Sequence, residues 1–451
     1  MLQIGGIKIE KISGPVSFCI LKPTQKFLEF AEDDQIPMQI LLGDEHYSFE
    51  HTCGTLDAEH VLTTNSVIVS NFAQNWFRLL DSICTEQHPI DYFIESFVPF
   101  KELQKPNKQL MKIAPSVMTY IAQHHIPCFS REQKEIKRDK CLTKNIRYHM
   151  AEVRWGKEHS LIFDAHMHDY HYESNLASSL LTSCFEYHRD NSEFLAKFKQ
   201  AVEKPEMFFT IFFDFNNINL RSNSLIWKQL LKQRTGAKGL FKWIQFITRY
   251  YGFVLKSLQT DPAFAPTQQI ALECLQTFDA EQKTFQMYST GDFTKCDPLI
   301  EANKAKYQKA IRDMQFYLTL PFIDIYYLLR SWKYTSTPRQ WCNVFNAGHL
   351  HTFFIQQFLV TNKFFEIMGE NINKTSPQTR CLTFTKHFSL DQFVPGGIPK
   401  NVNLKVSILG LWMYWNLLNG TKIKTESLRA IASFQHLDPQ LLLNVYAEFT
   451  A

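Results

Sequence analysis

Two short segments with the pattern Gly-x-x-His carry the residue types that hydrolytic chemistry requires. The first, Gly43–His46, reads GDEH, and the second, Gly348–His351, reads GHLH. Imidazoles and carboxylates bind catalytic metals, and they also exchange protons near neutral pH. Glu95, the first residue after the apolar run DYFI, is the carboxylate that we expect to act with both segments.

The elements that must position these residues are three apolar runs of strand length, at 38–42, 91–94 and 341–345. Each run ends just before one of the candidate groups. Ligands of parallel α/β sheets collect beyond the carboxyl ends of the strands, so the pattern predicts one site at one sheet edge. We expect Gly43 to form a tight turn with an unusual φ, and residues 346–348 to interrupt the third strand.

A divalent metal ion is the cofactor that this residue set predicts. His46, His351 and Glu95 would be its three protein ligands and would leave one position open for water; the identity of the metal stays open. Without a metal, the same groups could act as a general base and its orienting carboxylate. Either Glu45 or Asp44 would assist proton transfer, although Asp44 could instead cap the following turn.

The order of the expected elements predicts an α/β fold with a mostly parallel sheet formed by the N- and C-terminal parts of the chain. Residues 1–170 would be the first part of this core and residues 336–390 the second. Between them, 171–335 has helical periodicity and is expected to be a large helical insertion, interrupted by a strand at 207–213. Residues 391–451 would form a helical C-terminal tail.

Composition limits the classes of function. With 48 basic and 44 acidic residues, the net charge of +4 gives no strong nucleic-acid signal, and 39 phenylalanines indicate a large packed interior. The apolar run 404–418 has only 15 residues, so we expect a buried helix and no transmembrane span. The ten cysteines include no Cys-x-x-Cys pair, and no secretion signal is visible. We therefore expect reduced thiols and a cytoplasmic location.

A second histidine cluster competes with the first. The segment 164–168 reads DAHMH, and His166 and His168 would lie on one side of a strand end, as metal ligands require. It resembles the first metal motif of amidohydrolases, which are TIM barrels. Because no regular series of strands and helices follows it, a solvent-facing polar loop is the favoured interpretation.

The expected strand at 146–153 also carries charge on both faces. Arg147 and His149 share one face by the two-residue period, and Glu152 and Arg154 share the other. Glu152 and Arg154 could line the cleft beside Glu95, but an ion pair within the sheet is the favoured interpretation.

The order GDEH, helix, DYFIES, long helical stretch and NAGHLH resembles the superfamily of TraB/Tiki proteins, erythromycin esterases and ChaN-like haem-binding proteins. Its members carry two Gly-x-x-His motifs and a Glu on the strand after the first motif. The resemblance also implies an arginine on the helix before the second motif, here Arg330, with Arg339 as the nearby alternative. Arg330 would stabilise developing negative charge.

More narrowly, the blocks ISGPVSFCILKP, ILLGDEHYS, PIDYFIES and NVFNAGHLH resemble uncharacterised proteins of nucleocytoplasmic large DNA viruses. His349 stands where those proteins often have Asp, so the second motif departs from their pattern, and His349 is a further candidate site residue. The resemblance implies a location in the host cytoplasm or the virion. Superfamily members include metal-dependent proteases, metal-independent esterases and haem binders. The resemblance therefore implies the position of a site but leaves the reaction open.

Two hypotheses for the function follow. The first is a metal-dependent hydrolase acting on a peptide or an ester. The alternative is a catalytically silent viral or effector scaffold whose helical insertion or C-terminal tail binds a protein partner. An enzyme requires His46, Glu95 and His351 to lie in one cleft, with no pair separated by much more than about 8 Å.

Overall fold

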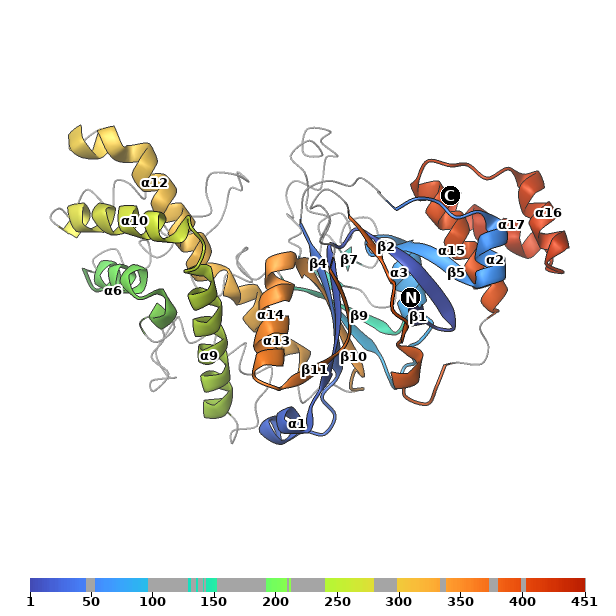
Figure 1. Cartoon of the computed structure of the whole chain (residues 1–451), viewed down its shortest axis with the longest axis horizontal. Helices are drawn as coiled ribbons and strands as arrows, with labels where there is room; N and C mark the ends of the chain where they lie inside the picture. The colour runs from blue at the N-terminus through green and yellow to red at the C-terminus, as the bar shows by residue number, and fades with distance from the viewer. Residues whose placement is uncertain are drawn as a thin grey trace. The chain divides into compact units, whose positions relative to one another are not determined.

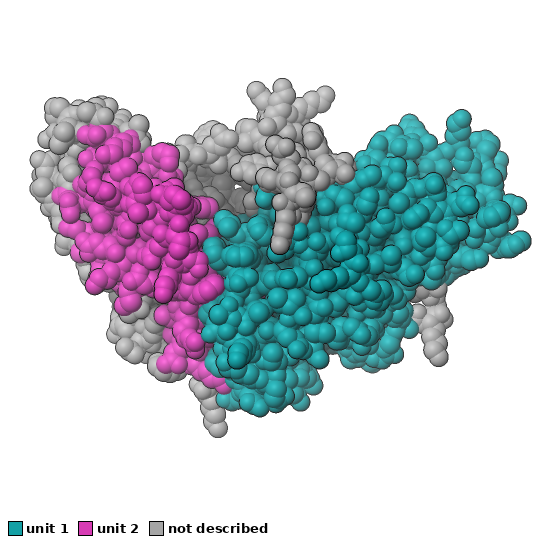
Figure 2. Space-filling model, viewed as in Figure 1, with its two compact units in different colours: residues 1–151, 336–451 teal, residues 152–335 magenta. Residues whose placement is uncertain are grey.

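The computed structural model describes residues 1–45, 53–95, 129–130, 135–136, 141, 143–151, 192–208, 211, 240–279, 298–332, 338–372, 380–398 and 403–450. The chain divides into two compact units (Figure 2), of which the first comprises Met1–Ala151 and Ser336–Ala451 and the second Glu152–Thr335. Several residues of the sequence interpretation lie outside the described residues, namely His46, Glu152, Arg154, His166 and His168.

A six-stranded sheet is the centre of the first unit, with the order β11-β3-β4-β10-β6-β9. Its strands are β3 (Ser17–Pro23), β4 (Met38–Asp44), β6 (Ile90–Ile94), β9 (Ile146–Met150), β10 (Cys342–Gly348) and β11 (Phe365–Ile372). The four strands β4, β10, β6 and β9 are parallel, whereas β3 is antiparallel to both of its neighbours. Because β10 lies between β4 and β6, both ends of the chain build this core, and the predicted mostly parallel α/β fold is confirmed.

A smaller sheet packs against the first. It contains β1 (Leu2–Ile4), β2 (Ile7–Ser13), β5 (Ser66–Ser70), β12 (Cys381–Thr383) and β13 (Phe388–Ser389). Strand β2 pairs with β1, β5 and β12. One apolar cluster joins side chains of both sheets, including Ile9 and Val67 from the smaller sheet and Ile40 and Val344 from the larger. A separate short hairpin joins β7 (Phe129–Ser130) to β8 (Glu135–Ile136).

Helices cover the strands of the first unit. They are α1 (Gln25–Ala31), α2 (Ala58–Thr64), α3 (Gln74–Asp81), α14 (His349–Thr361), α15 (Leu404–Leu418), α16 (Thr425–Phe434) and α17 (Pro439–Thr450). Helix α14 packs on β4 and β10, and α15 packs on β5, α2 and α17 (Figure 1). The predicted helical tail is confirmed, and α15 buries eight of its residues. Among the described helices, none is long and apolar enough to cross a membrane.

The second unit is helical where it is described. It contains α6 (Ser192–Glu203), the 3-10 helix η4 (Pro205–Met207), α9 (Leu240–Leu258), α10 (Phe264–Asp279), α12 (Pro298–Thr319) and α13 (Pro321–Ser331).

The strand expected at 207–213 is wrong at its start, because Met207 ends η4 and Phe208 has helical dihedral angles of −48° and −46°. Phe208 is buried and stacks on Tyr251 with ring centres 5.8 Å apart. Apolar residues in a short run do not by themselves distinguish a strand from a buried helical segment.

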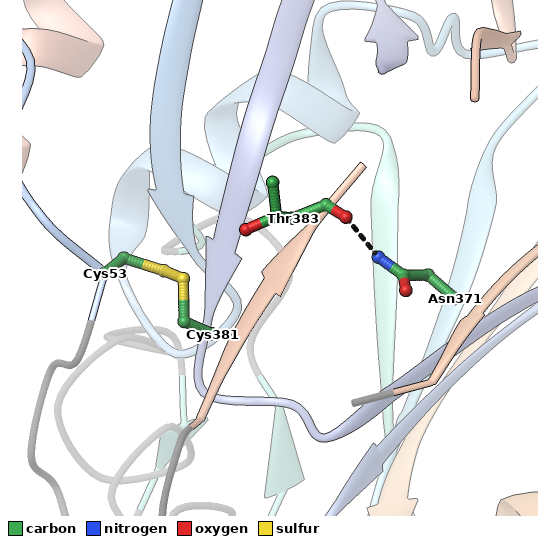
Figure 3. The surroundings of a disulfide bond; sticks show 4 residues. All are labelled: Cys53, Asn371, Cys381 and Thr383. Atoms are coloured by element: carbon green, nitrogen blue, oxygen red, sulfur yellow. Dashed lines mark hydrogen bonds between the residues drawn. A yellow bond between two sulfur atoms is a disulfide. The ribbon is translucent and has the colours of Figure 1, made fainter. Parts of the chain in front are cut away.

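A disulfide joins two distant parts of the first unit. Cys53 is bonded to Cys381 across 328 residues of sequence, with their Cα atoms 5.2 Å apart (Figure 3). Cys141 is disulfide-bonded as well. The expectation that all ten thiols are reduced is therefore wrong. Linear spacing could not reveal the Cys53–Cys381 pair, because the pairing of β12 with β2 brings Cys381 into place.

Candidate functional site

Three strand ends meet at one edge of the larger sheet. In the register of β4 and β10, Asp44 lies opposite Gly348. On the other side of β10, the backbone N–H of Glu95 donates to the carbonyl of Asn346 at 3.0 Å. The structure thus places Asp44, Gly348 and Glu95 on three consecutive strands, β4, β10 and β6, at their carboxyl ends.

Glu95 makes two contacts with the second Gly-x-x-His segment. Its Oε2 accepts a 2.6 Å hydrogen bond from the backbone N–H of Gly348, and its Oε1 lies 3.5 Å from Nε2 of His351. Both side chains are buried, with Glu95 7% and His351 3% exposed. Gly348 is the N-cap of α14, so the Glu95 carboxylate lies at the positive end of that helix, where negative charge is stabilised.

His349 faces a different neighbour. Its Nδ1 lies 2.8 Å from Oγ of Ser17 on β3, so the hydroxyl fixes the orientation of the ring. Burial lowers the pKa of His349 below its ordinary value, and the imidazole is therefore neutral at neutral pH. The two histidines of the segment thus serve two separate contacts, one with Ser17 and the other with Glu95.

Position 43 favours glycine because its neighbours leave little room for a side chain. Its φ is not among the positive values of the described glycines, so the expected unusual turn conformation is wrong. A Cβ at position 43 would come within 2.6 Å of Oγ1 of Thr352 and closer still to Oγ of Ser17. Gly43 therefore allows α14 and β3 to approach the end of β4 closely. The expected interruption at residues 346–348 is wrong too, because β10 continues to Gly348.

Asp44 has a charged partner that the sequence did not indicate. Oδ1 of Asp44 lies 3.6 Å from a guanidinium nitrogen of Arg380, and the two side chains are only 0% and 4% exposed. Arg380 directly precedes Cys381 in a polar stretch with no recognisable motif, so no pattern in the sequence could have identified it. Glu45 follows Asp44 and is half-buried.

The two predicted arginines belong to different units of the chain. Arg330 is a half-buried residue of α13 in the second unit. Arg339 forms a two-point ion pair with Asp33, with distances of 2.8 and 2.7 Å, and it lies before the amino end of β10. Arg339 is therefore at the end of the strand opposite to the candidate site.

A second buried charge cluster occupies β6 and β9. Asp91 pairs with Arg147, and its other carboxylate oxygen lies 3.4 Å from Nε2 of His149. Burial alone would raise the pKa of Asp91, but His149 and Arg147 outweigh it and lower that pKa to about 2. Arg147 also donates to the carbonyl of Pro338 at 2.8 Å. Because Asp91 is near the start of β6, the cluster stabilises the sheet away from the carboxyl edge.

The geometry of Glu95 and His351 suits a shared metal ion. Two ligands at 2.0–2.2 Å in tetrahedral coordination lie about 3.4 Å apart, close to the 3.5 Å measured between Oε1 and Nε2. This distance exceeds that of an ordinary hydrogen bond. The described residues include no group of three potential metal ligands, and the predicted third ligand, His46, lies outside them.

No protein-family model matches the chain, and no curated protein or solved structure matches it.

Proposed function

We propose that the first unit is a hydrolase in which Glu95 and His351 activate a water molecule. The observation that carries this proposal is the 3.5 Å approach of Oε1 of Glu95 to Nε2 of His351 beside the N-terminus of α14. Buried histidine–carboxylate pairs at the carboxyl edge of a parallel sheet suit general-base chemistry. Peptides and esters are the substrate classes, because both react by attack of water on a carbonyl carbon.

Each group has a distinct role in this mechanism. His351 would take the proton from water, and the negative charge of Glu95 would stabilise the imidazolium that forms. The hydrogen bond from Gly348 holds the Glu95 carboxylate in place during this transfer. Negative charge that develops on the carbonyl oxygen would be stabilised by the N-terminus of α14, where backbone N–H groups point outward.

A divalent metal is compatible with the same residues. Glu95 and His351 would hold it, and His46 is the predicted third ligand. When bound, such an ion polarises a carbonyl and lowers the pKa of a coordinated water. The hydrogen bond from the Gly348 N–H would then orient Glu95 as a ligand, since groups that hydrogen-bond a ligand set its direction.

The test compares Glu95→Gln and His351→Asn with the wild-type protein on generic ester and peptide substrates. We expect both variants to lose most of the activity, because each removes one half of the pair. Metal content is measured on the same preparations, and supplementation with Zn²⁺, Mn²⁺ and Mg²⁺ separates the metal-dependent mechanism from the metal-free one. Equal background rates in all three proteins would contradict the proposal and favour a scaffold that binds a protein partner.

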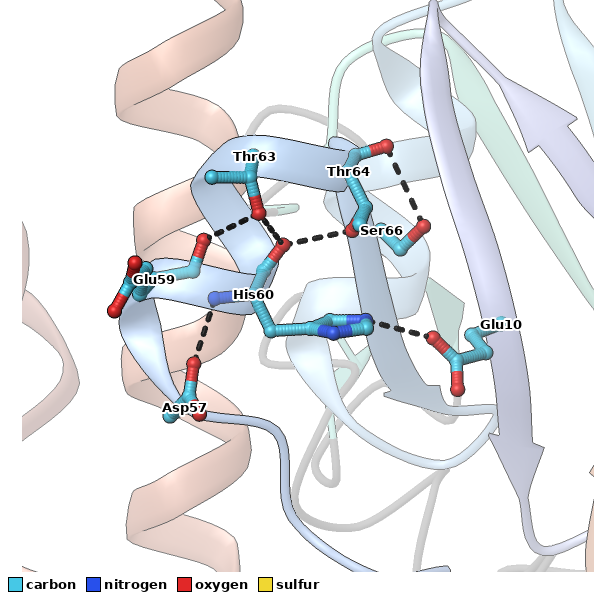
Figure 4. Close-up of polar contacts among 7 residues, drawn as sticks. All are labelled: Glu10, Asp57, Glu59, His60, Thr63, Thr64 and Ser66. Carbon is cyan, nitrogen blue, oxygen red and sulfur yellow. Dashed lines mark hydrogen bonds and ion pairs between the residues drawn. The ribbon is translucent and has the colours of Figure 1, made fainter.

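His60→Asn is the matched control. His60 pairs with Glu10 at 3.1 Å on α2, and it is anchored by Asp57, which caps that helix (Figure 4). This is also a histidine–glutamate pair of the first unit, but it is more exposed and it joins α2 to β2 instead of lying on the three strand ends. Its substitution should leave the hydrolytic rate unchanged.

The Cys53–Cys381 disulfide indicates the kind of compartment in which the protein is located. Disulfides persist in oxidising environments and are rare in a reducing cytosol. The Cys53–Cys381 bond therefore favours the virion or another oxidising location over the host cytoplasm. Mass analysis of protein isolated from its natural source, after alkylation without reduction, would test this: alkylated Cys53 and Cys381 would contradict it.

A further inference from the structure

A group of buried polar side chains lies at the carboxyl end of β5, next to the candidate site. Ser70 and Asn71 are 0% exposed, and Asn75 in the first turn of α3 is 1% exposed. Among the described residues, no hydrogen-bond partner is present for Oγ of Ser70, Oδ1 of Asn71, or either polar atom of the Asn75 amide. Folded proteins rarely leave buried polar atoms unmet, so this group calls for a bound partner.

Hydrogen bonds connect this group to the strand that carries the second Gly-x-x-His segment. Nδ2 of Asn71 donates to Oδ1 of Asn346 at 3.3 Å. Nδ2 of Asn346 in turn donates to Oη of Tyr92 at 3.0 Å, which fixes the direction of that amide. Asn346 lies two residues before Gly348 in β10, so the polar group reaches the sheet edge where Glu95 and His351 meet.

The Asp44–Arg380 ion pair is also connected to these buried polar side chains, through Gly14. The backbone N–H of Gly14 donates to the carbonyl of Arg380 at 2.9 Å. Oδ1 of Asn71 occupies the space that a Cβ at position 14 would fill, so Asn71 and Arg380 both lie against Gly14. Arg380 pairs with Asp44, and Asp44 lies opposite Gly348 in the sheet. These contacts connect Asn346, Asn71, Arg380 and Asp44, and Ser70 and Asn75 are close to Asn71 along the chain. We call these six residues the amide cluster.

The chemistry of the amide cluster defines what it would bind. Arg380 and Asp44 form an ion pair, and the other members of the cluster are uncharged. Asn75 alone offers two donor hydrogens and an acceptor oxygen, the pattern that a carboxamide complements. Because the polar atoms are buried, the tip of a side chain can reach them more readily than a peptide backbone can.

We propose that the amide cluster binds a carboxamide group of the substrate, such as the side chain of glutamine or asparagine. This inference rests on the proposed hydrolase function and narrows its substrate class to carboxamide-bearing peptides. Asp44 and Glu95 end strands separated by one intervening strand, so their backbones are about 10 Å apart. That distance equals roughly three residues of extended peptide. The carboxamide would therefore belong to a residue near the scissile bond rather than to the reacting group.

The experiment uses hexapeptides that differ at one position, where glutamine is compared with methionine, an apolar side chain of similar length. Glutamine is placed at each position in turn, and kcat/KM is measured for wild-type protein. Binding of the same peptides is measured by calorimetry on Glu95→Gln, where cleavage is blocked. We expect one position to favour glutamine by on the order of tenfold or more, because a buried polar site discriminates against an analogue that cannot hydrogen-bond.

Asn75→Leu replaces the amide with an apolar group of similar volume and should abolish this preference. Ser70→Ala is a second, smaller change that should weaken it if Asn75→Leu fails to fold. Cleavage without any preference for glutamine would overturn this inference and leave the hydrolase intact. Preferential binding of glutamine peptides without cleavage would sustain the amide cluster and remove the hydrolase. A preference that is unchanged in Asn75→Leu or Ser70→Ala would also overturn it, as expected if only water fills the cluster.

Discussion

The backbone N–H of Gly348 donates a 2.6 Å hydrogen bond to Oε2 of Glu95, which joins the end of β6 to the start of α14. Glu95 thus combines two roles, as the partner of the N-cap residue of a helix and as the partner of His351. A loss of activity after substitution of Glu95 could arise from either role. The first prediction separates them.

Glu95→Gln and Glu95→Leu should differ in stability but agree in activity. Glutamine keeps an oxygen that can accept from Gly348, whereas leucine leaves that N–H without its acceptor. We expect Glu95→Leu to lower the free energy of unfolding by about 1–3 kcal/mol more than Glu95→Gln does. Urea unfolding measures this difference. Equal stability losses in the two variants would show that the hydrogen bond from Gly348 contributes little.

Gly43→Ala tests the close packing at the first motif. The new Cβ would come within 2.6 Å of Oγ1 of Thr352, and closer to Ser17, so these side chains must rotate or α14 and β3 must shift. We expect a loss of about 1–3 kcal/mol in the free energy of unfolding, as overpacking usually costs. Gly54→Ala is the matched control, because a Cβ there meets nothing within 4 Å. A tolerated Gly43→Ala would mean that the glycine is not needed for space.

The sequence predicts the parts of this fold that depend on local periodicity. The apolar run at 38–42 is part of β4, and the run at 404–418 is the buried helix α15. Both could be predicted because a buried strand or helix has a regular pattern of apolar residues along a continuous segment. The smaller sheet was not anticipated as a unit, since it joins β2 to β12 across more than 360 residues. Pairing over such separations has no local pattern.

The candidate site also has one part that the sequence predicts and one part that it does not. The three strand ends could be predicted, because each follows an apolar run and carries a chemically distinctive residue. The partners of those residues could not, since Ser17 and Arg380 are single polar side chains in unremarkable surroundings. Their importance comes from the strand to which they belong and from the neighbour that the register gives them.

Asp91 should make the stability of the protein depend on acidity. The pKa of this carboxyl falls from its ordinary 3.8 to about 2 in the folded chain, so the unfolded chain binds the proton more readily. The stabilisation is therefore present above pH 4 and is lost as the pH falls toward 2, about 2 kcal/mol in all. Asp91→Asn should be less stable at neutral pH, because Arg147 loses its buried partner, and should lack this acid dependence. Unfolding in urea between pH 6 and pH 2 distinguishes the two proteins, and parallel curves would contradict the assignment.

His349 should contribute a second pH dependence in a higher range. Burial lowers its pKa below the ordinary 6.5, so the folded chain resists protonation more than the unfolded chain does. Its contribution is complete above pH 6.5 and declines as the pH falls below that value. In His349→Asn the stability should vary less between pH 7 and pH 5. Nuclear magnetic resonance titration of the ring gives the pKa directly, and a value above 6.5 would contradict the prediction.

The Cys53–Cys381 disulfide should stabilise the first unit and the candidate site together. It closes a loop of 328 residues, and crosslinks over long loops restrict the unfolded chain most. Cys53→Ala/Cys381→Ala should therefore lower the free energy of unfolding by about 2–4 kcal/mol. Because Arg380 adjoins Cys381 and pairs with Asp44, the same variant should also weaken catalysis of carboxamide-bearing peptides. The matched control is Cys274→Ala, which removes a buried free thiol of the second unit. If reducing agent lowers the stability of the double variant as much as that of the wild type, then the effect comes from another bond and this prediction fails.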